Sequence, residues 1–195
     1  MAITTDDIKA LRERTGLSVM DCKQALESTD GDMDKAIIAL RKKSSTAAAK
    51  KAERDLGAGV VQSYIHASQD VGALVLLSCE TDFVAKNEEF VQLAHDIAMH
   101  ATATSPEFVN RDQVTEESTD KARQLFEEEA KDKPEEMRTK IVEGKMESYL
   151  KERVLTEQPY IKDPEVTIAG LVERATQKFG ERIEISDCVR LSVRG

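Results

Sequence analysis

The stretch LVLLSCETDFVAKNEEF, residues 74–90, decides how this chain folds. Its first six residues are mostly apolar, as in a buried strand, and its last residues are typical of the start of a helix. Between them stands Thr81-Asp82-Phe83-Val84, with an acid and a large aromatic where a turn usually carries Gly, Ser or Asn. Because the chain has only five Phe and three Tyr, an aromatic side chain at this turn requires an explanation.

The segments around this stretch predict an α+β fold. AGVVQSYIHA (58–67) and VGALVLLSC (71–79) are strand-like runs separated by SQD, which predicts an antiparallel hairpin. RIEISDCVRLSV (182–193) predicts a third strand, in which Ile183 and Ile185, and then Val189, Leu191 and Val193, alternate with polar residues. A sheet of three strands with one apolar face needs helices over it. Helical periodicity predicts those helices at 87–101, 137–156 and 165–179, and a solvated helical arm at 116–136, where acids outnumber bases.

The first 42 residues predict a bundle of three short helices. Thr4, Ser18 and Asp32 are the expected N-caps, and Gly16 ends the first helix. The following run, RKKSSTAAAKKAERD (41–55), contains six basic residues. It is either an electropositive arm for an acidic partner or a solvated helical linker, and the nearby acids favour the linker. The expected domains are therefore 1–42, a linker at 43–56 and a core at 57–195.

Composition excludes several classes of protein. A net charge of −9 argues against a general nucleic-acid binder, which needs clustered Lys and Arg. The three cysteines form no CxxC pair, so neither a disulfide framework nor a zinc knuckle is indicated, and a reducing cytoplasm is expected. The N-terminus does not resemble a signal peptide, and no apolar run is long enough to cross a bilayer. We therefore expect a cytoplasmic protein that contacts neither membrane nor nucleic acid directly.

The chain offers poor material for catalysis. Cys79 with His66, His95 or His100 would be the candidate nucleophile and base, but Cys79 ends an apolar strand, where an inert buried thiol is far more common. His95 and His100 are five residues apart, so on a helix they point about 140° apart and cannot easily share one metal ion. Neither a Walker loop nor a GxGxxG motif occurs. We expect no enzyme activity, no metal and no cofactor.

Asp82 and Phe83 remain as the unusual residues. Asp82 is interpreted either as an N-cap or turn residue or as a contact residue, and Phe83 either as a lid folded over the sheet or as a wedge for a partner. Two observations weaken the structural alternatives, since Asn87 already supplies a cap for the next helix and Phe90 already begins its inner face. An exposed Phe83 buried in a partner's groove would contribute about 1.5–3 kcal/mol of binding free energy.

Five motifs together resemble the elongation factor Ts family. They occur in the family's order and extend over nearly the whole chain: LRERTG…MDCKQAL (11–26), YIH (64–66), CETDFVAKNEEF (79–90), DIAMH (96–100) and EQPYIKD (157–163). The resemblance implies a guanine-nucleotide exchange factor that binds the GTPase elongation factor Tu and speeds the release of its GDP. It also implies that the N-terminal helices form a bundle similar to ubiquitin-associated domains, which docks on the nucleotide-binding domain of the GTPase.

The resemblance also implies site residues. Arg12, Met20 and Lys23 match contact residues of the docking bundle, and His66 matches a position of the core that touches the partner. Residues 81–84 match the family loop that reaches towards the Mg²⁺ site of the bound nucleotide. In that loop the phenylalanine wedges between helices of the GTPase, and the aspartate helps to hold the displaced segment.

Two departures from the family pattern matter. Longer members carry the hairpin-and-helix core twice, whereas this chain has room for one copy, and short members imply a homodimer. The C-terminal GERI is similar to the family, but Ser186-Asp187-Cys188 replaces the basic and aromatic residues usual there. The alternative hypothesis is an interaction module that recruits a ubiquitin-like or ribosomal partner without exchange activity, and an enzyme is a distant third.

Overall fold

The computed structural model describes residues 3–194, without the side chains of Ala47, Ala48 and Lys50. Two compact units make up the chain. The first unit comprises the chain up to Gln62, Val75–His95 and Ala169–Ser186, and the second comprises Ser63–Leu74, Asp96–Ile168 and the segment from Asp187 onward. No helix within residues 3–194 is both long and apolar enough to cross a membrane.

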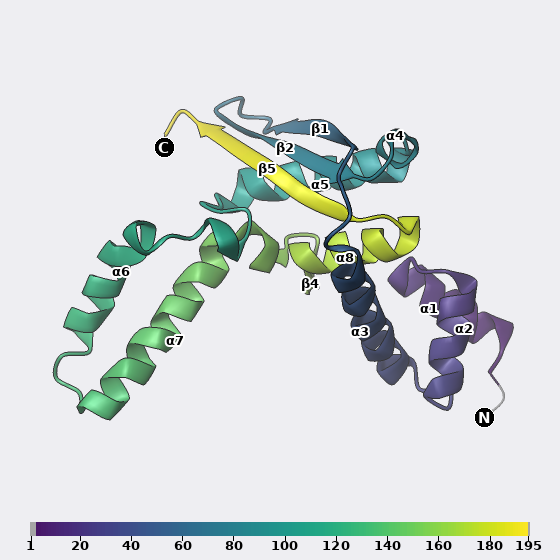
Figure 1. Cartoon of the computed structure of the whole chain (residues 1–195), viewed down its shortest axis with the longest axis horizontal. Coiled ribbons are helices and arrows are strands. Elements are labelled where there is room, and N and C mark those ends of the chain that lie inside the picture. The colour runs from purple at the N-terminus through teal and green to yellow at the C-terminus, as the bar shows by residue number, and fades with distance from the viewer. Residues whose placement is uncertain (1–2, 195) are drawn as a thin grey trace. The chain divides into compact units, whose positions relative to one another are not determined.

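The fold is α+β, as the sequence predicts. A three-stranded antiparallel sheet has the order β1-β2-β5, so that β2 lies between its neighbours (Figure 1). Its strands are β1 (Ala58–Ile65), β2 (Val71–Cys79) and β5 (Ile183–Ser192). Each of these three strands matches a run of sequence that predicted it. The hairpin between β1 and β2 is closed by a hydrogen bond from the His66 amide to the Val71 carbonyl, at 3.0 Å.

Three helices form the N-terminal part of the first unit, and their caps are the predicted ones. They are α1 (Thr5–Thr15), α2 (Val19–Ser28) and α3 (Met33–Lys51). The side chains of Thr4, Ser18 and Asp32 each accept a hydrogen bond from an amide in the first turn. Gly16 ends α1 with φ +71°, a left-handed conformation that side chains rarely adopt. The interior of the bundle is apolar and includes Leu11, Leu17, Leu26 and Leu40.

Helix α3 continues to Lys51, through most of the basic segment that the sequence suggested as a linker. Contacts within the first unit link α3 to the last helix, α8 (Ile168–Phe179). The Ser44 hydroxyl donates to the Gln177 side chain, and Lys51 Nζ donates to the Thr176 carbonyl at 3.3 Å. The segment after the bundle is therefore an ordered helix with its own contacts.

The helix α5 (Glu88–Thr104) carries the apolar stripe that its sequence predicts, and it runs along the sheet in Figure 1. In the first unit, Phe90 and Ala94 of α5 are fully buried, as are Val75 and Leu77 of β2. The Phe90 ring meets Phe179 of α8 edge-on, with 6.1 Å between the ring centroids. These side chains form the apolar layer under this part of the sheet.

The apolar series of β5 is only partly covered. Ile183 and Ile185 are buried, as predicted, but Val189, Leu191 and Val193 are exposed. The expectation of one apolar face under helices is therefore wrong for the second half of this strand. In the second unit, the exposed residues instead line an open depression together with Ile65 and Leu74.

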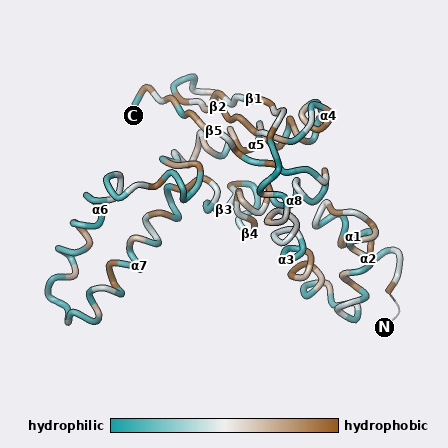
Figure 2. Tube along the Cα trace, in the orientation of Figure 1, coloured by the Kyte–Doolittle hydropathy of each residue, from teal (hydrophilic) through white to brown (hydrophobic). Residues whose placement is uncertain are grey.

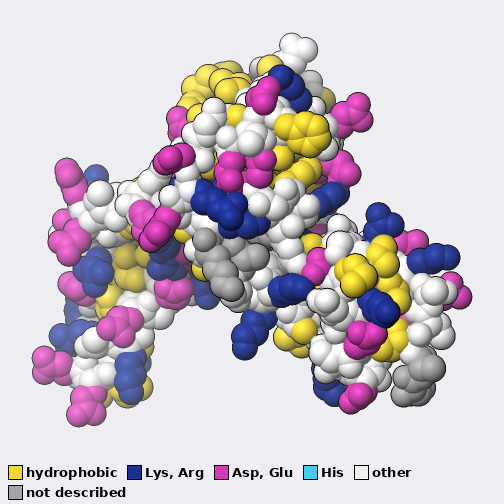
Figure 3. All heavy atoms as spheres, turned by 45° about the vertical axis from the view of Figure 1, so that its right-hand side comes forward, with side chains coloured by type: hydrophobic (Ala, Val, Ile, Leu, Met, Phe, Trp, Pro, Cys, Tyr) yellow, Lys and Arg dark blue, Asp and Glu magenta, His cyan; other side chains and the backbone are white. Residues whose placement is uncertain are grey.

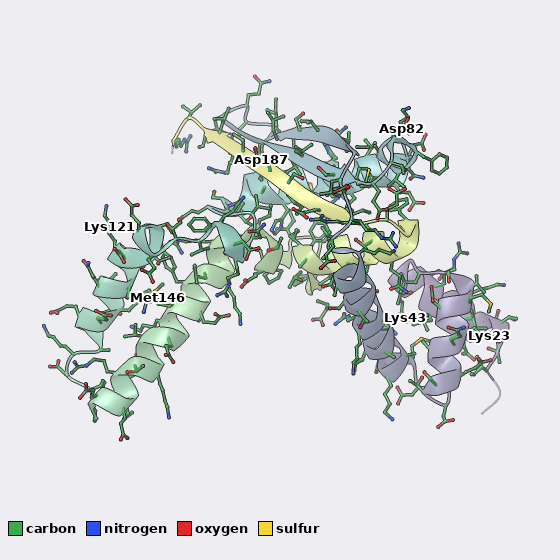
Figure 4. All side chains as sticks on the ribbon, viewed as in Figure 1. Lys23, Lys43, Asp82, Lys121, Met146 and Asp187 are labelled. Carbon is green, nitrogen blue, oxygen red and sulfur yellow. The ribbon has the colours of Figure 1, made fainter. Side chains whose placement is uncertain are left out.

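The second unit carries a helical hairpin made of α6 (Glu116–Glu129) and α7 (Glu135–Arg153). The predicted boundary is wrong here, because the turn at 130–134 divides the acidic segment that was expected to be one arm. Most of α6 is hydrophilic (Figure 2), so the two helices share a small core of Ala130, Val142 and Met146. Met146 lies between the two helices in Figure 4.

Short elements complete the second unit. Two 3-10 turns are η1 (Arg111–Gln113) and η2 (Leu155–Glu157), and a two-stranded sheet pairs β3 (Pro159–Tyr160) with β4 (Asp163–Thr167) in antiparallel fashion. The sequence predicted a helix from residue 165, but Glu165 belongs to β4 and α8 begins at Ile168. Val166 and Thr167 are β-branched and favour extended backbone, and β4 pairs with β3, so the strand continues past Pro164 to Thr167.

Candidate partner-binding site

The unusual turn after β2 is a one-turn helix, α4 (Asp82–Ala85), in the first unit (Figure 1). Val84 and Phe83 of this helix differ in their exposure to solvent. Val84 is 4% exposed and anchors the turn, whereas the neighbouring Phe83 is 82% exposed. The interpretation of Phe83 as a lid over the sheet is therefore wrong. The ring projects into solvent, where it is available to another molecule.

Hydrogen bonds on the side of β2 fix the start of this turn. The Glu181 carboxylate accepts from the Glu80 and Thr81 amides at 3.1 and 3.0 Å, and from the Thr81 hydroxyl at 2.6 Å. The Glu80 carboxylate in turn accepts from the Arg182 amide and from the Arg54 guanidinium. The hydrogen bond from the Arg182 amide is the main reason why the pKa of Glu80 lies below its usual value.

Asp82 stands on the exposed side of α4 (Figure 4). Its carboxylate pairs with Lys86 of the next turn at 2.6 Å, and this bond holds the pKa of Asp82 below its usual value. Thr81 occupies the N-cap position without a side-chain cap bond, because its hydroxyl donates to Glu181. Asp82 is therefore not the cap of this helix, and it stays ionised at the surface next to Phe83.

The three residues singled out on the N-terminal bundle are exposed. Met20 is 62% exposed at the start of α2, next to the exposed Val19, and hydrophobic side chains reach the surface among charged ones on this bundle (Figure 3). Lys23 lies one turn further along α2, where it pairs with Glu27 at 3.8 Å (Figure 4). Arg12 lines a cleft of about 350 Å³ beside the loop from Gly16 to Ser18. The bundle thus presents an exposed apolar side chain, Met20, and two exposed bases.

His66 belongs to the second unit, at the turn of the β1–β2 hairpin. Its Nδ1 lies 2.8 Å from the Ser68 hydroxyl, and that hydroxyl donates to Asp70. The order of these contacts differs from a nucleophilic triad, in which the histidine stands between the serine and the acid. The three side chains stabilise an exposed turn, and Nε2 of His66 forms none of these bonds.

The other groups considered for chemistry are inert or already bonded. Cys79 is fully buried, and burial raises the pKa of its thiol, which disfavours the nucleophilic thiolate. His100 is fully buried as well, with Nε2 at 2.9 Å from the Gln158 side chain, and burial lowers its pKa. Among residues 3–194, no group of three or more His, Cys, Asp or Glu side chains is arranged to hold a metal ion.

Comparison with known proteins identifies the family. The family model described as elongation factor TS matches residues 20–194. Elongation factor Ts of Thermodesulfovibrio yellowstonii is 45% identical over 194 residues, covering 99% of this chain and 97% of that protein. The chain belongs to the elongation factor Ts family.

Other relatives with the same name match nearly all of this chain. Elongation factor Ts of Carboxydothermus hydrogenoformans is 47% identical over 193 residues, which cover 98% of this chain and 89% of the relative. That of Herpetosiphon aurantiacus is 45% identical over 195 residues, which cover 99% and 98%. The resemblance predicted from the five motifs is therefore confirmed.

Sequence reasoning missed Glu181, the residue that holds the start of the elongation factor Ts loop in place. The signal was present in GERI (180–183), which resembles the family sequence. It carried no meaning without the fold, because Glu181 is far from Thr81 in the sequence. Gly180, with φ +76°, ends α8 in a left-handed turn, and Glu181 follows it.

Proposed function

We propose that this chain is a guanine-nucleotide exchange factor, which binds elongation factor Tu in its GDP form and accelerates the release of GDP. The observation that carries the proposal is Phe83, an aromatic side chain that is 82% exposed on a turn held by hydrogen bonds and by buried Val84. When a partner buries a ring that is exposed in the folded chain, the burial contributes about 1.5–3 kcal/mol of binding free energy. Family membership supplies the partner, the translational GTPase.

The proposed mechanism is a coupling between two binding equilibria. GDP is held in a GTPase by Mg²⁺ and by phosphate contacts in a site shielded from water, where charge interactions are strong. Phe83 inserts between helices next to that site, and Asp82 holds the displaced segment. Displacement of the metal-binding elements weakens GDP affinity, and GDP must weaken the binding of the exchange factor by the same factor. No covalent bond changes, so the chain acts without being an enzyme.

A second contact area supports the wedge. We propose that residues 1–42 dock on the nucleotide-binding domain through Met20, with Arg12 and Lys23 pairing with acids of the GTPase. Residues 43–56 then connect this bundle to the core at 57–195, which presents the Phe83 turn and His66. Exposed side chains of these types are suited to this role, since aromatic, methionine and arginine side chains are enriched at interfaces.

We further propose that the core pairs with a second copy of itself. In the second unit an open depression of about 560 Å³ is lined by exposed apolar side chains of all three strands, Ile65, Leu74, Val189 and Leu191, and by Val193 just after β5. A two-fold dimer buries the same patch on both copies, and an apolar patch is complementary to itself.

Release of labelled GDP from elongation factor Tu tests the exchange function. We expect the intact chain to accelerate release, Phe83→Ala to lose most of that acceleration, and Leu125→Ala to keep it. Leu125 is a matched control, because it is an exposed apolar residue on α6, outside the proposed contacts. Binding without faster release would overturn the proposal and favour a recruiting module, and absence of binding would also overturn it.

A further inference from the structure

We infer that Glu181 is a positioning residue for exchange, because its carboxylate fixes the turn that presents Phe83. The inference rests on the proposed function and names the group that keeps the wedge ready before the partner arrives. Glu181 itself does not contact the nucleotide site in this scheme. It acts through Thr81 and the backbone in front of Phe83.

The contacts of Glu181 are concentrated on one short segment. One oxygen, Oε2, accepts the amides of Glu80 and Thr81 at 3.1 and 3.0 Å. The other oxygen, Oε1, accepts the Thr81 hydroxyl at 2.6 Å. Thr81 is the N-cap of α4, and these amides stand where β2 has ended and α4 has not yet closed its first turn. The carboxylate thus bonds donors that neither regular element satisfies.

Other contacts anchor this segment at neighbouring points, since the Glu80 carboxylate accepts hydrogen bonds from the Arg182 amide and the Arg54 guanidinium. Val84 is buried, and the Cys79 thiol lies 3.2 Å from the Thr81 carbonyl, so the far end of the turn and the strand end are anchored separately. Lys86 pairs with exposed Asp82. Without Glu181, the Glu80 and Thr81 amides would turn to water, and the turn would sample several orientations while the sheet beneath it stays folded. A disordered wedge pays an ordering cost on binding, which a fixed wedge avoids.

Glu181→Ala in the full-length chain tests this inference. We expect the rate of GDP release at a fixed low concentration of the variant to fall about tenfold, the size associated with one net hydrogen bond to a charged acceptor. Glu181→Gln retains an acceptor oxygen for the amides and should recover a large part of the loss. Thr81→Val removes only the hydroxyl contact and should lose less than Glu181→Ala. These two variants also carry the test if Glu181→Ala does not fold.

A double-mutant comparison separates positioning from general stability. If Glu181 acts through Phe83, adding Glu181→Ala to Phe83→Ala should change the rate by less than about twofold. Glu184→Ala is the control, since Glu184 is a nearby acid of β5 that bonds the Arg182 side chain. We expect the control to leave exchange unchanged. Equal losses from Glu181→Ala in both backgrounds would overturn the inference, because they would indicate a role independent of the ring.

Hydrogen exchange of the free chain gives a reading without the GTPase. In Glu181→Ala we expect the Glu80 and Thr81 amides to exchange faster, while the amides of β2 and α5 keep their protection. Unchanged protection at these two amides would overturn the inference. Failure of the proposed function has a different signature, since Phe83→Ala would then leave GDP release unaltered while the amide result at Glu181 still stands.

Discussion

Two phenylalanines close together in the sequence allow the same substitution to be compared at an exposed and a buried position. Phe83 is 82% exposed on α4, whereas Phe90 is fully buried at the start of α5 and packs edge-on against Phe179. Truncation of either ring to alanine removes the same atoms. The consequences differ because only Phe90 is taken out of water when the chain folds.

The magnitudes follow from burial. Phe90→Ala leaves a cavity in the apolar layer and should lower the free energy of unfolding by about 3–5 kcal/mol. Phe83→Ala removes a side chain with few partners and should change it by less than about 0.5 kcal/mol. For binding the expectation reverses. Phe83→Ala removes the ring that the partner would bury, and so loses about 1.5–3 kcal/mol of binding free energy. Affinity for the GTPase should therefore weaken by about 10- to 150-fold.

Urea denaturation followed by circular dichroism measures the first quantity, and titration of elongation factor Tu with the variant measures the second. The stability of Phe90→Ala should be measured at a temperature at which the variant is still folded in the absence of urea. The reasoning is refuted if Phe83→Ala costs more than about 2 kcal/mol of stability, because the ring would then be buried within its own chain. It is equally refuted if affinity and exchange are unchanged in a folded Phe83→Ala protein.

Three further outcomes are expected. His100 is buried, and burial lowers its pKa, so the unfolded chain takes up a proton at a higher pH than the folded chain does. Stability should therefore fall as the pH drops below about 6.5. In melting experiments at several pH values, His100→Gln should reduce this loss of stability. Leu191→Glu places a charge in the open apolar depression and should disrupt the proposed dimer. The mass measured by sedimentation equilibrium should then fall from twice 21.7 kDa to 21.7 kDa. A wild-type mass of 21.7 kDa would contradict the proposed pairing. Gly144 lies in the middle of α7, and no atom lies within 4 Å of the position of an added Cβ. Gly144→Ala should therefore stabilise the helical hairpin by about 0.5–1 kcal/mol. Hydrogen exchange in α6 and α7 should become slower, and faster exchange would contradict this expectation.

The local elements were predictable because their signals are local. A capping side chain is within three residues of the amide that it satisfies, so Thr4, Ser18 and Asp32 could be assigned as caps from the sequence. Strand alternation and the stripe of α5 likewise repeat within a few residues. The errors fall where local signals conflict, as at Val166 and Thr167, where an extended strand replaces the first turn of a predicted helix.

Motifs and periodicity were sufficient to predict the family and the α+β class and to single out Asp82 and Phe83, because these signals need no knowledge of distant contacts. Which apolar residues are covered could be seen from the tertiary contacts alone. Leu191 continues the alternation of Ile185, yet it is 71% exposed while Ile185 is buried. Burial depends on which elements pack over a strand. The hydrogen bonds between Glu181 and Thr81 likewise depend on the packing of two segments about a hundred residues apart, which no local sequence pattern predicts.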